Sequence, residues 1–274
     1  MMVLARQIRK PGAVCSAPEY NEPNMTPVND PAVEPEPEEM GEVSRLIGVF
    51  FEPAKAFADI VERPRWLVPM VLAILASLAY TISLGQRIGW ERIIDQQIQS
   101  RAAQMSEQQR AAVERSKPLQ VKIASVASYA GVFLGIPAYY LAASGVLFLI
   151  VNGLMGAAAR FKQVFAVMCY AGLPGAIYAA LAAVSVNLQS DPADFDIKNP
   201  LPFNPGWWMS PDGASKFLRS LAASVDLFSI WSLLLIAAGL NAAGGKRLTF
   251  GGALAAVVLP WAVLCLARAT LIAR

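Results

Sequence analysis

Residues 123–151 read IASVASYAGVFLGIPAYYLAASGVLFLIV and contain no charged residue. Four further apolar stretches lie at 67–85, 165–188, 221–240 and 250–267. Each is close to the ~20 residues that a helix needs to cross about 30 Å of hydrocarbon. Because lipid offers the backbone no hydrogen-bond partner, such stretches are stable there only as helices. The sequence therefore predicts an all-α integral membrane protein, whose residues 67–274 form a bundle of five transmembrane helices.

The composition agrees with a membrane protein and argues against several other classes. Hydrophobic residues make up 55% of the chain and charged residues 16%, against about 25% charged in a typical soluble domain. A net charge of +3 is too small to indicate a nucleic-acid partner. The chain has no histidine and three scattered cysteines, so we expect no metal site and no cofactor. Motifs of hydrolases, zinc proteases and nucleotide-binding loops are absent, and we expect a non-enzymatic protein.

The first 42 residues have the composition of a disordered tail. Seven prolines fall between Pro11 and Pro37, and glutamates cluster toward the end of the stretch. Such a segment has too little apolar surface to offset the entropy lost on ordering. We predict a disordered Pro/Glu-rich tail over residues 1–42.

Residues 43–66 form an amphipathic segment directly before the first span. Phe50, Phe57 and Ile60 recur on one helical face, and Trp66 follows where aromatic belts lie. One interpretation, which we favour, places the apolar face in the acyl boundary of the membrane interface. The other packs this face on the cytoplasmic end of the bundle.

The first connection, residues 86–122, is too polar to span a membrane and predicts an extramembrane helical hairpin. Ser106 and Gln109 have the spacing of a capping box, which would begin the second helix of the hairpin. Lys117 and Pro118 predict a break between this helix and the second span.

The second span contains Gly131 and Gly135, a spacing of small residues that lets a neighbouring helix approach closely. We expect close packing inside the bundle here, and a dimer face is the alternative. Pro137, two residues later, predicts a kink.

In the third span Gly172, Pro174 and Gly175 predict a bend or a break. Interrupted helices mark substrate sites in some transporters, but most are kinks that neighbouring helices repair.

Asp226 is the one carboxylate within the five stretches. A charged carboxylate at the bilayer centre costs roughly 2.5–3.5 kcal/mol, so its presence needs a reason. Ser229 lies on the same helical face and Trp231 follows in the same segment. The functional interpretation is a proton- or cation-linked site that faces the interior of the bundle. We favour the structural alternative, in which the carboxylate is shallow or is hydrogen-bonded for packing.

The short connections set the expected orientation. The connection 157–163 carries Arg160 and Lys162, and the connection 242–249 carries Lys246 and Arg247. Basic short loops face the cytoplasm, which places the N-terminus inside and the C-terminus outside a plasma membrane. In this orientation the first connection lies outside, although it holds seven lysines and arginines.

Four segments of the chain have a recognisable pattern: RLIGVFFEP at 45–53 with the residues up to Trp66, MSEQ at 105–108, and the segments 165–174 and 226–231. They resemble the corresponding segments in bacterial members of the Yip family of integral membrane proteins. The resemblance implies a five-span bundle with a cytoplasmic N-terminus, and it brings no catalytic residues. Eukaryotic relatives are implicated in vesicle traffic through Rab-type GTPases, but this chain lacks their Asp-Leu-Tyr-Gly-Pro motif, so GTPase binding is not carried over.

Together these features predict membrane organisation or protein–protein interaction in the bilayer. The expected partners are the lipid bilayer, unidentified membrane or cytoplasmic proteins, and a second copy of the chain in a homo-oligomer. The alternative is a small transporter or channel component that uses the interrupted third span and Asp226.

Overall fold

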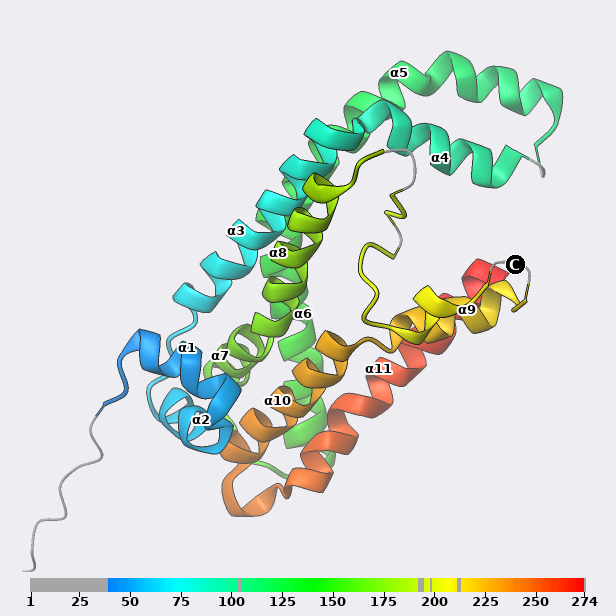
Figure 1. Cartoon of the computed structure of the whole chain (residues 1–274). Helices are drawn as coiled ribbons and strands as arrows, with labels where there is room; N and C mark the ends of the chain where they lie inside the picture. The colour runs from blue at the N-terminus through cyan, green and yellow to red at the C-terminus, as the bar shows by residue number, and fades with distance from the viewer. Residues whose placement is uncertain (1–38, 103–104, 192–194, 198, 211–212, 274) are drawn as a thin grey trace, which may run out of the picture. The chain divides into compact units, whose positions relative to one another are not determined.

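The computed structural model describes residues 39–102, 105–191, 195–197, 199–210 and 213–273. All regular secondary structure in these residues is helical, and Figure 1 shows how the helices are arranged. Five helical runs are long and apolar enough to cross a membrane: Leu67–Ile88, Glu107–Leu154, Phe161–Leu188, Leu227–Arg247 and Phe250–Ile272. The predicted all-α fold with five candidate spans is therefore confirmed. The predicted tail falls outside the described residues up to position 38.

The five runs are built from helices with local irregularities. The first is α3 (Leu67–Ser83) followed by the π-helical η1 (Leu84–Ile88). The second is α5 (Glu107–Ala130), η2 (Gly131–Gly135), α6 (Ile136–Leu149) and η3 (Ile150–Leu154). The third is α7 (Phe161–Ala171) with α8 (Leu173–Leu188). The fourth is α10 (Leu227–Gly244) with η6 (Gly245–Arg247), and the fifth is α11 (Phe250–Ala273).

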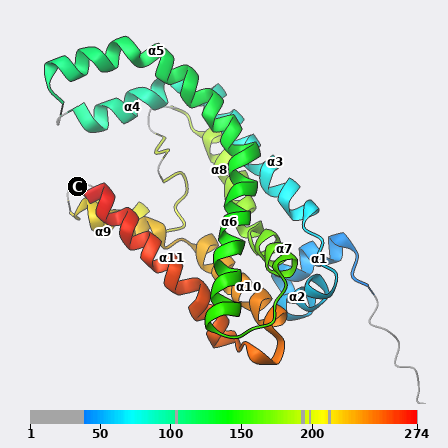
Figure 2. The ribbon, with the colours of Figure 1, turned by 180° about the vertical axis from the view of Figure 1, so that it is seen from behind.

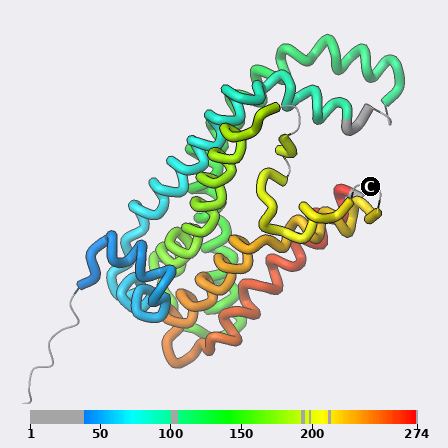
Figure 3. The backbone as a smooth tube through the Cα atoms, in the orientation of Figure 1, coloured from blue at the N-terminus to red at the C-terminus, as the bar shows by residue number. Residues whose placement is uncertain are grey.

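The core of the bundle lies around α7. Val164, Val167 and Tyr170 of this helix are fully buried, and α7 packs against α6, α10 and α2. The helix α3 packs along α8, and α10 along α11; both pairs can be followed in Figure 3. At Gly239 of α10 the side chains of Val167 and Phe57 occupy the place of a Cβ atom. Only glycine fits there, and its absent side chain lets α10 lie close to both neighbours.

The amphipathic segment forms two helices, α1 (Glu42–Phe51) and α2 (Pro53–Glu62), that pack onto the bundle. Phe57 and Ile60 are fully buried in the core between α2, α7 and α10. The favoured prediction of an apolar face in the acyl boundary is therefore wrong for these two residues. Their face is covered by protein, and Gly239 leaves room for the ring of Phe57. Glu42, assigned to the tail, is the first residue of α1.

The hairpin is present, formed by α4 (Trp90–Ala102) and the first part of α5. The capping box is confirmed: the Gln109 N–H donates to Ser106 Oγ at 3.3 Å, and the Ser106 N–H donates to Gln109 Oε1 at 2.9 Å. The predicted break at Pro118 is wrong, because this residue lies inside α5. The helix loses one backbone hydrogen bond there, while Ser116 links Val113 and Gln120 around the site.

The predicted close packing at Gly131 and Gly135 is also wrong. Both glycines are exposed, and no described atom outside their own helical turn lies within 4 Å of a Cβ built on either. The neighbouring helices contact the opposite face of this run, where Val132, Tyr140 and Leu147 are buried. Small residues permit two helices to approach closely, but their spacing alone does not show on which face of the helix the neighbour packs. The predicted interruption near Pro137 takes the form of η2, which ends just before it.

Candidate functional site

A cavity of about 530 Å³ lies among α6, α7, α8, α10, α11 and the short helix α9 (Lys216–Ser224). Gly172, Gly175, Asp226 and Ser229 all line it. The structure therefore brings the interruption in the third span and the carboxylate of the fourth to one surface. Pro174 does not line it; it is buried in the first turn of α8.

The break in the third span is confirmed at the predicted residues. The helix α7 ends at Ala171, Gly172 stands between the two helices, and α8 begins at Leu173. The hydroxyl of Tyr140, on α6, lies where a Cβ of Gly172 would be. The glycine therefore lets α6 approach the joint between α7 and α8.

Asp226 is the N-cap of α10. Its Oδ1 accepts hydrogen bonds from the N–H groups of Phe228 at 2.9 Å and Ser229 at 3.0 Å, and its Oδ2 accepts from the Ser229 hydroxyl. A carboxylate at a helix N-terminus satisfies otherwise unpaired donors and interacts favourably with the helix dipole. The predicted start of the fourth span at 221 is wrong, because the chain turns at Val225 and Asp226 between α9 and α10.

Other polar groups of the cavity were not predicted. Arg268 of α11 and Tyr178 of α8 line it. Arg268 falls one residue beyond the predicted end of the fifth span, and a lone arginine at a helix end is the only signal that the sequence offers. Asn199 and Asn204 also line the cavity and hydrogen-bond to each other.

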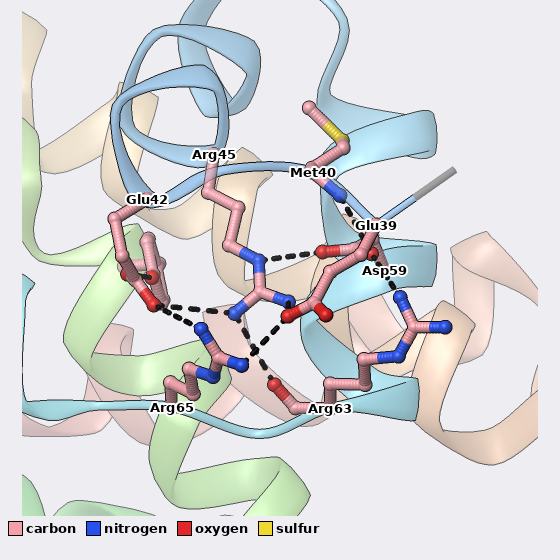
Figure 4. Close-up of polar contacts among 8 residues, drawn as sticks. Glu39, Met40, Glu42, Arg45, Asp59, Arg63 and Arg65 are labelled. Atoms are coloured by element: carbon pink, nitrogen blue, oxygen red, sulfur yellow. Dashed lines mark hydrogen bonds and ion pairs between the residues drawn. The ribbon is translucent and has the colours of Figure 1, made fainter. Parts of the chain in front are cut away.

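A second polar cluster fixes α1 to α2, as Figure 4 shows. The fully buried Arg45 places its Nε 2.5 Å from Asp59 Oδ2 and its Nη1 3.5 Å from Glu42 Oε1. Glu42 also accepts a hydrogen bond of 2.8 Å from the Tyr170 hydroxyl of α7. Arg65, in the segment after α2, pairs with Glu39 at 2.7 Å and with Glu42 at 3.4 Å.

Arg45 keeps its charge in this cluster. Burial disfavours the charged guanidinium, but the hydrogen bond with Asp59 and the nearby carboxylates outweigh it, so the pKa of Arg45 is raised above its ordinary value. No local pattern in the sequence singles out this arginine, because its partner Asp59 stands on the next helix. Periodicity within one helix does not show such a pairing.

The cluster leaves the opposite face of α1 uncovered. Val43, Ile47 and Phe51 lie on this face at successive helical turns, and all three are exposed, Phe51 by 81%. We call these three residues the α1 strip. Phe50, on the inner side, packs edge-to-face on Trp231 with ring centroids 5.1 Å apart. Trp231 is thus a packing residue away from the cavity.

Trp66 lies at the start of α3 and packs edge-to-face on Phe165, with centroids 5.4 Å apart. It remains partly exposed, and its place in an aromatic belt stays a prediction. Among the described residues no group of three or more potential metal ligands occurs.

Comparison with curated proteins and with solved structures finds no match. A family model, that of the Yip1 domain, matches residues 47–271. The match covers most of the chain, beginning within α1 and ending within α11, and it includes the cavity. Of the Arg45 cluster it includes Asp59, Arg65 and Tyr170, whereas Glu39, Glu42 and Arg45 lie before it. The chain therefore belongs to the Yip1 domain family.

Proposed function

We propose that this multi-pass membrane protein is not an enzyme and that it organises other proteins in the bilayer through contacts made by the α1 strip. The observation that carries the proposal is a row of large apolar side chains held outward on a helix that is itself fixed to the bundle. A preformed surface binds a partner without the entropy cost of ordering. Exposed apolar residues in a row are a usual feature of contact sites.

The buried ion cluster favours a protein partner over lipid alone. A helix that only rests in the interface is oriented by its own amphipathicity. Here Arg45, Glu42 and Asp59 fix the rotation of α1 by directional bonds to α2 and α7. A helix held in one orientation presents the same surface at all times, which favours recognition of a protein partner with a complementary surface.

Photocrosslinking in native membranes tests this function. A photoreactive phenylalanine analogue replaces Phe51 in one protein and Val263, an exposed residue of α11, in the control. We expect discrete protein adducts at position 51 that decrease when Ile47 is changed to Ser. A protein adduct at twice the mass of the chain would identify a second copy as the partner. Lipid adducts alone at position 51 would refute the proposal.

We further propose a bacterial plasma membrane with a cytoplasmic N-terminus. The two basic connections and the α1–α2 pair lie at the same end of the bundle (Figures 1 and 2), which the positive-inside rule assigns to the cytoplasm. Lys246→Cys should then react with a membrane-impermeant thiol reagent only after lysis of the cells. Labelling of intact cells would reverse the orientation.

Transport of a small solute is the second candidate, favoured by the shared cavity of Gly172, Gly175 and Asp226. The core beside it holds fully buried Val164, Val167 and Leu240, so a path across would require a second conformation. Proteoliposome flux that is lost in Asp226→Asn would support transport, and the absence of flux for a panel of ions and small solutes would argue against it. Asn can still cap α10, so this variant should fold.

A further inference from the structure

The cavity opens sideways between two candidate spans. Tyr139 of α6 and Leu264 of α11 line the cavity and are 65% and 68% exposed, so they form its rim. Both residues lie well inside their candidate spans. The helix α11 packs against η3 at one end, and Figure 2 shows α6 and α11 diverging from there. If these helices cross the bilayer, the rim lies at the depth of the acyl chains.

Two side chains of opposite type line the cavity: the half-buried Asp226 before α10 and the exposed Arg268 on α11. Asp226 supplies a carboxylate whose two oxygens accept three hydrogen bonds, all from its own helix end. Arg268 forms no hydrogen bond or ion pair with another residue that the structure describes, and the same holds for the Ser232 hydroxyl. The cavity thus offers a ligand the carboxylate oxygens of Asp226 as hydrogen-bond acceptors. The Arg268 guanidinium and the Ser232 hydroxyl are available as donors.

We propose that this cavity binds a membrane phospholipid whose headgroup carries both a phosphate and a primary ammonium group. The Arg268 guanidinium is suited to the phosphate, because its planar donors match phosphate oxygens. Asp226 accepts hydrogen bonds from the ammonium group. A quaternary ammonium has no N–H to donate, and an anionic headgroup would leave Asp226 facing another negative group.

Size and lining agree with a lipid that is only partly enclosed. The volume of about 530 Å³ falls within the roughly 300–1,000 Å³ of small-molecule sites. Leu233, Ile236 and Leu264 form an apolar wall that leads toward the rim. The acyl chains would follow this wall and leave between Tyr139 and Leu264 into the bilayer. This proposal does not depend on the contact role of the α1 strip.

Native mass spectrometry of the purified full chain tests the proposal. The protein in detergent is titrated with phosphatidylethanolamine, phosphatidylcholine or phosphatidylglycerol of identical acyl chains. We expect one phosphatidylethanolamine per chain, with the other two lipids bound about tenfold or more weakly, the loss expected for one charge-assisted hydrogen bond. Equal binding of the three lipids would overturn the proposal.

Single substitutions distinguish lipid bound in the cavity from lipid bound on the membrane-facing surface. Leu264→Trp should obstruct the rim and abolish the tight site, whereas Leu259→Trp, at an exposed α11 residue outside the cavity, should not. Asp226→Asn should remove the preference for phosphatidylethanolamine over phosphatidylcholine, that is, for the primary ammonium over the quaternary one. Arg268→Gln should weaken the binding of both of these lipids. Unchanged binding in Leu264→Trp and Arg268→Gln would mean that only annular lipid is bound.

Discussion

Replacing Arg45 with Met tests whether the buried ion cluster holds α1 and α2 on the bundle. The methionine fills similar space, but it removes the charge that faces Asp59 at 2.5 Å and Glu42 at 3.5 Å. Removing one partner of a buried ion pair costs about 3–5 kcal/mol. In the variant Asp59 still has an ion pair with Arg63 at 3.6 Å, and Glu42 still has one with Arg65 at 3.4 Å. We therefore expect a loss of stability at the lower end of this range, about 3 kcal/mol.

Thermal unfolding in detergent measures this loss. A thiol-reactive dye reports the exposure of the buried Cys169 and Cys265, with Cys15 changed to Ser in every protein. At about 2–4 °C per kcal/mol for a domain of similar size, Arg45→Met should lower the Tm by about 6–12 °C.

The exposed pair of Lys55 with Glu52 provides the matched control. Lys55→Met should shift the Tm by a fraction of that amount, because exposed ion pairs contribute about 0–1 kcal/mol. In the double variant Arg45→Met, Asp59→Leu, part of the loss should return, since no carboxylate is then left without its arginine. Equal small shifts for Arg45→Met and Lys55→Met would refute the role assigned to the cluster.

Three further substitutions test the packing by the same Tm assay. Gly172→Ala places a methyl group where a tyrosine hydroxyl lies and should cost about 1–3 kcal/mol, whereas Gly175→Ala meets no atom within 4 Å and should be nearly neutral. Phe57→Ala should cost about 3–5 kcal/mol because the ring is fully buried, whereas Phe51→Ala on the exposed strip should have little effect. Asp226→Ala should cost about 0.5–2 kcal/mol through loss of the α10 cap, and Asp226→Asn much less.

For each of these three pairs of substitutions, one result would contradict the prediction. Similar shifts for the two glycine variants would mean that α6 does not approach the joint between α7 and α8. A loss at Phe51 as large as that at Phe57 would place the α1 strip inside the fold. Equal losses for Asp226→Ala and Asp226→Asn would show that the charge, and not the cap, stabilises α10.

The sequence predicted the spans because length and apolarity are sufficient to identify helices that can cross a membrane. It could not fix their ends: the apolar run before Asp226 continues into α9, and only the N-cap hydrogen bonds show where α10 begins. It also could not tell whether lipid or protein covers an apolar face. Phe57 and Ile60 fit either environment, and the room for the Phe57 ring comes from Gly239, far away in the chain.

The candidate site was predictable residue by residue but not as an assembly. Gly172 and Asp226 were each conspicuous by themselves, one as a glycine two residues before a proline within a predicted span and one as a carboxylate in an apolar stretch. Their shared cavity depends on how six helices converge, which a single sequence does not encode in any local pattern. The glycines at 131 and 135 show the converse, since a spacing typical of contacts lies on an exposed face.

The continuous helical run from Glu107 to Leu154 links two distant parts of the protein. Its 48 residues have a contour length of about 72 Å at 1.5 Å per residue, while the hydrocarbon core takes only about 30 Å. The α6 part of this run carries Tyr139 and Tyr140 on the cavity wall, and the first part of α5 forms an arm of the hairpin, with η2 and a bend between the two parts (Figure 2). One unbroken helical run therefore joins the wall of the cavity to a segment that extends beyond the length a membrane can cover.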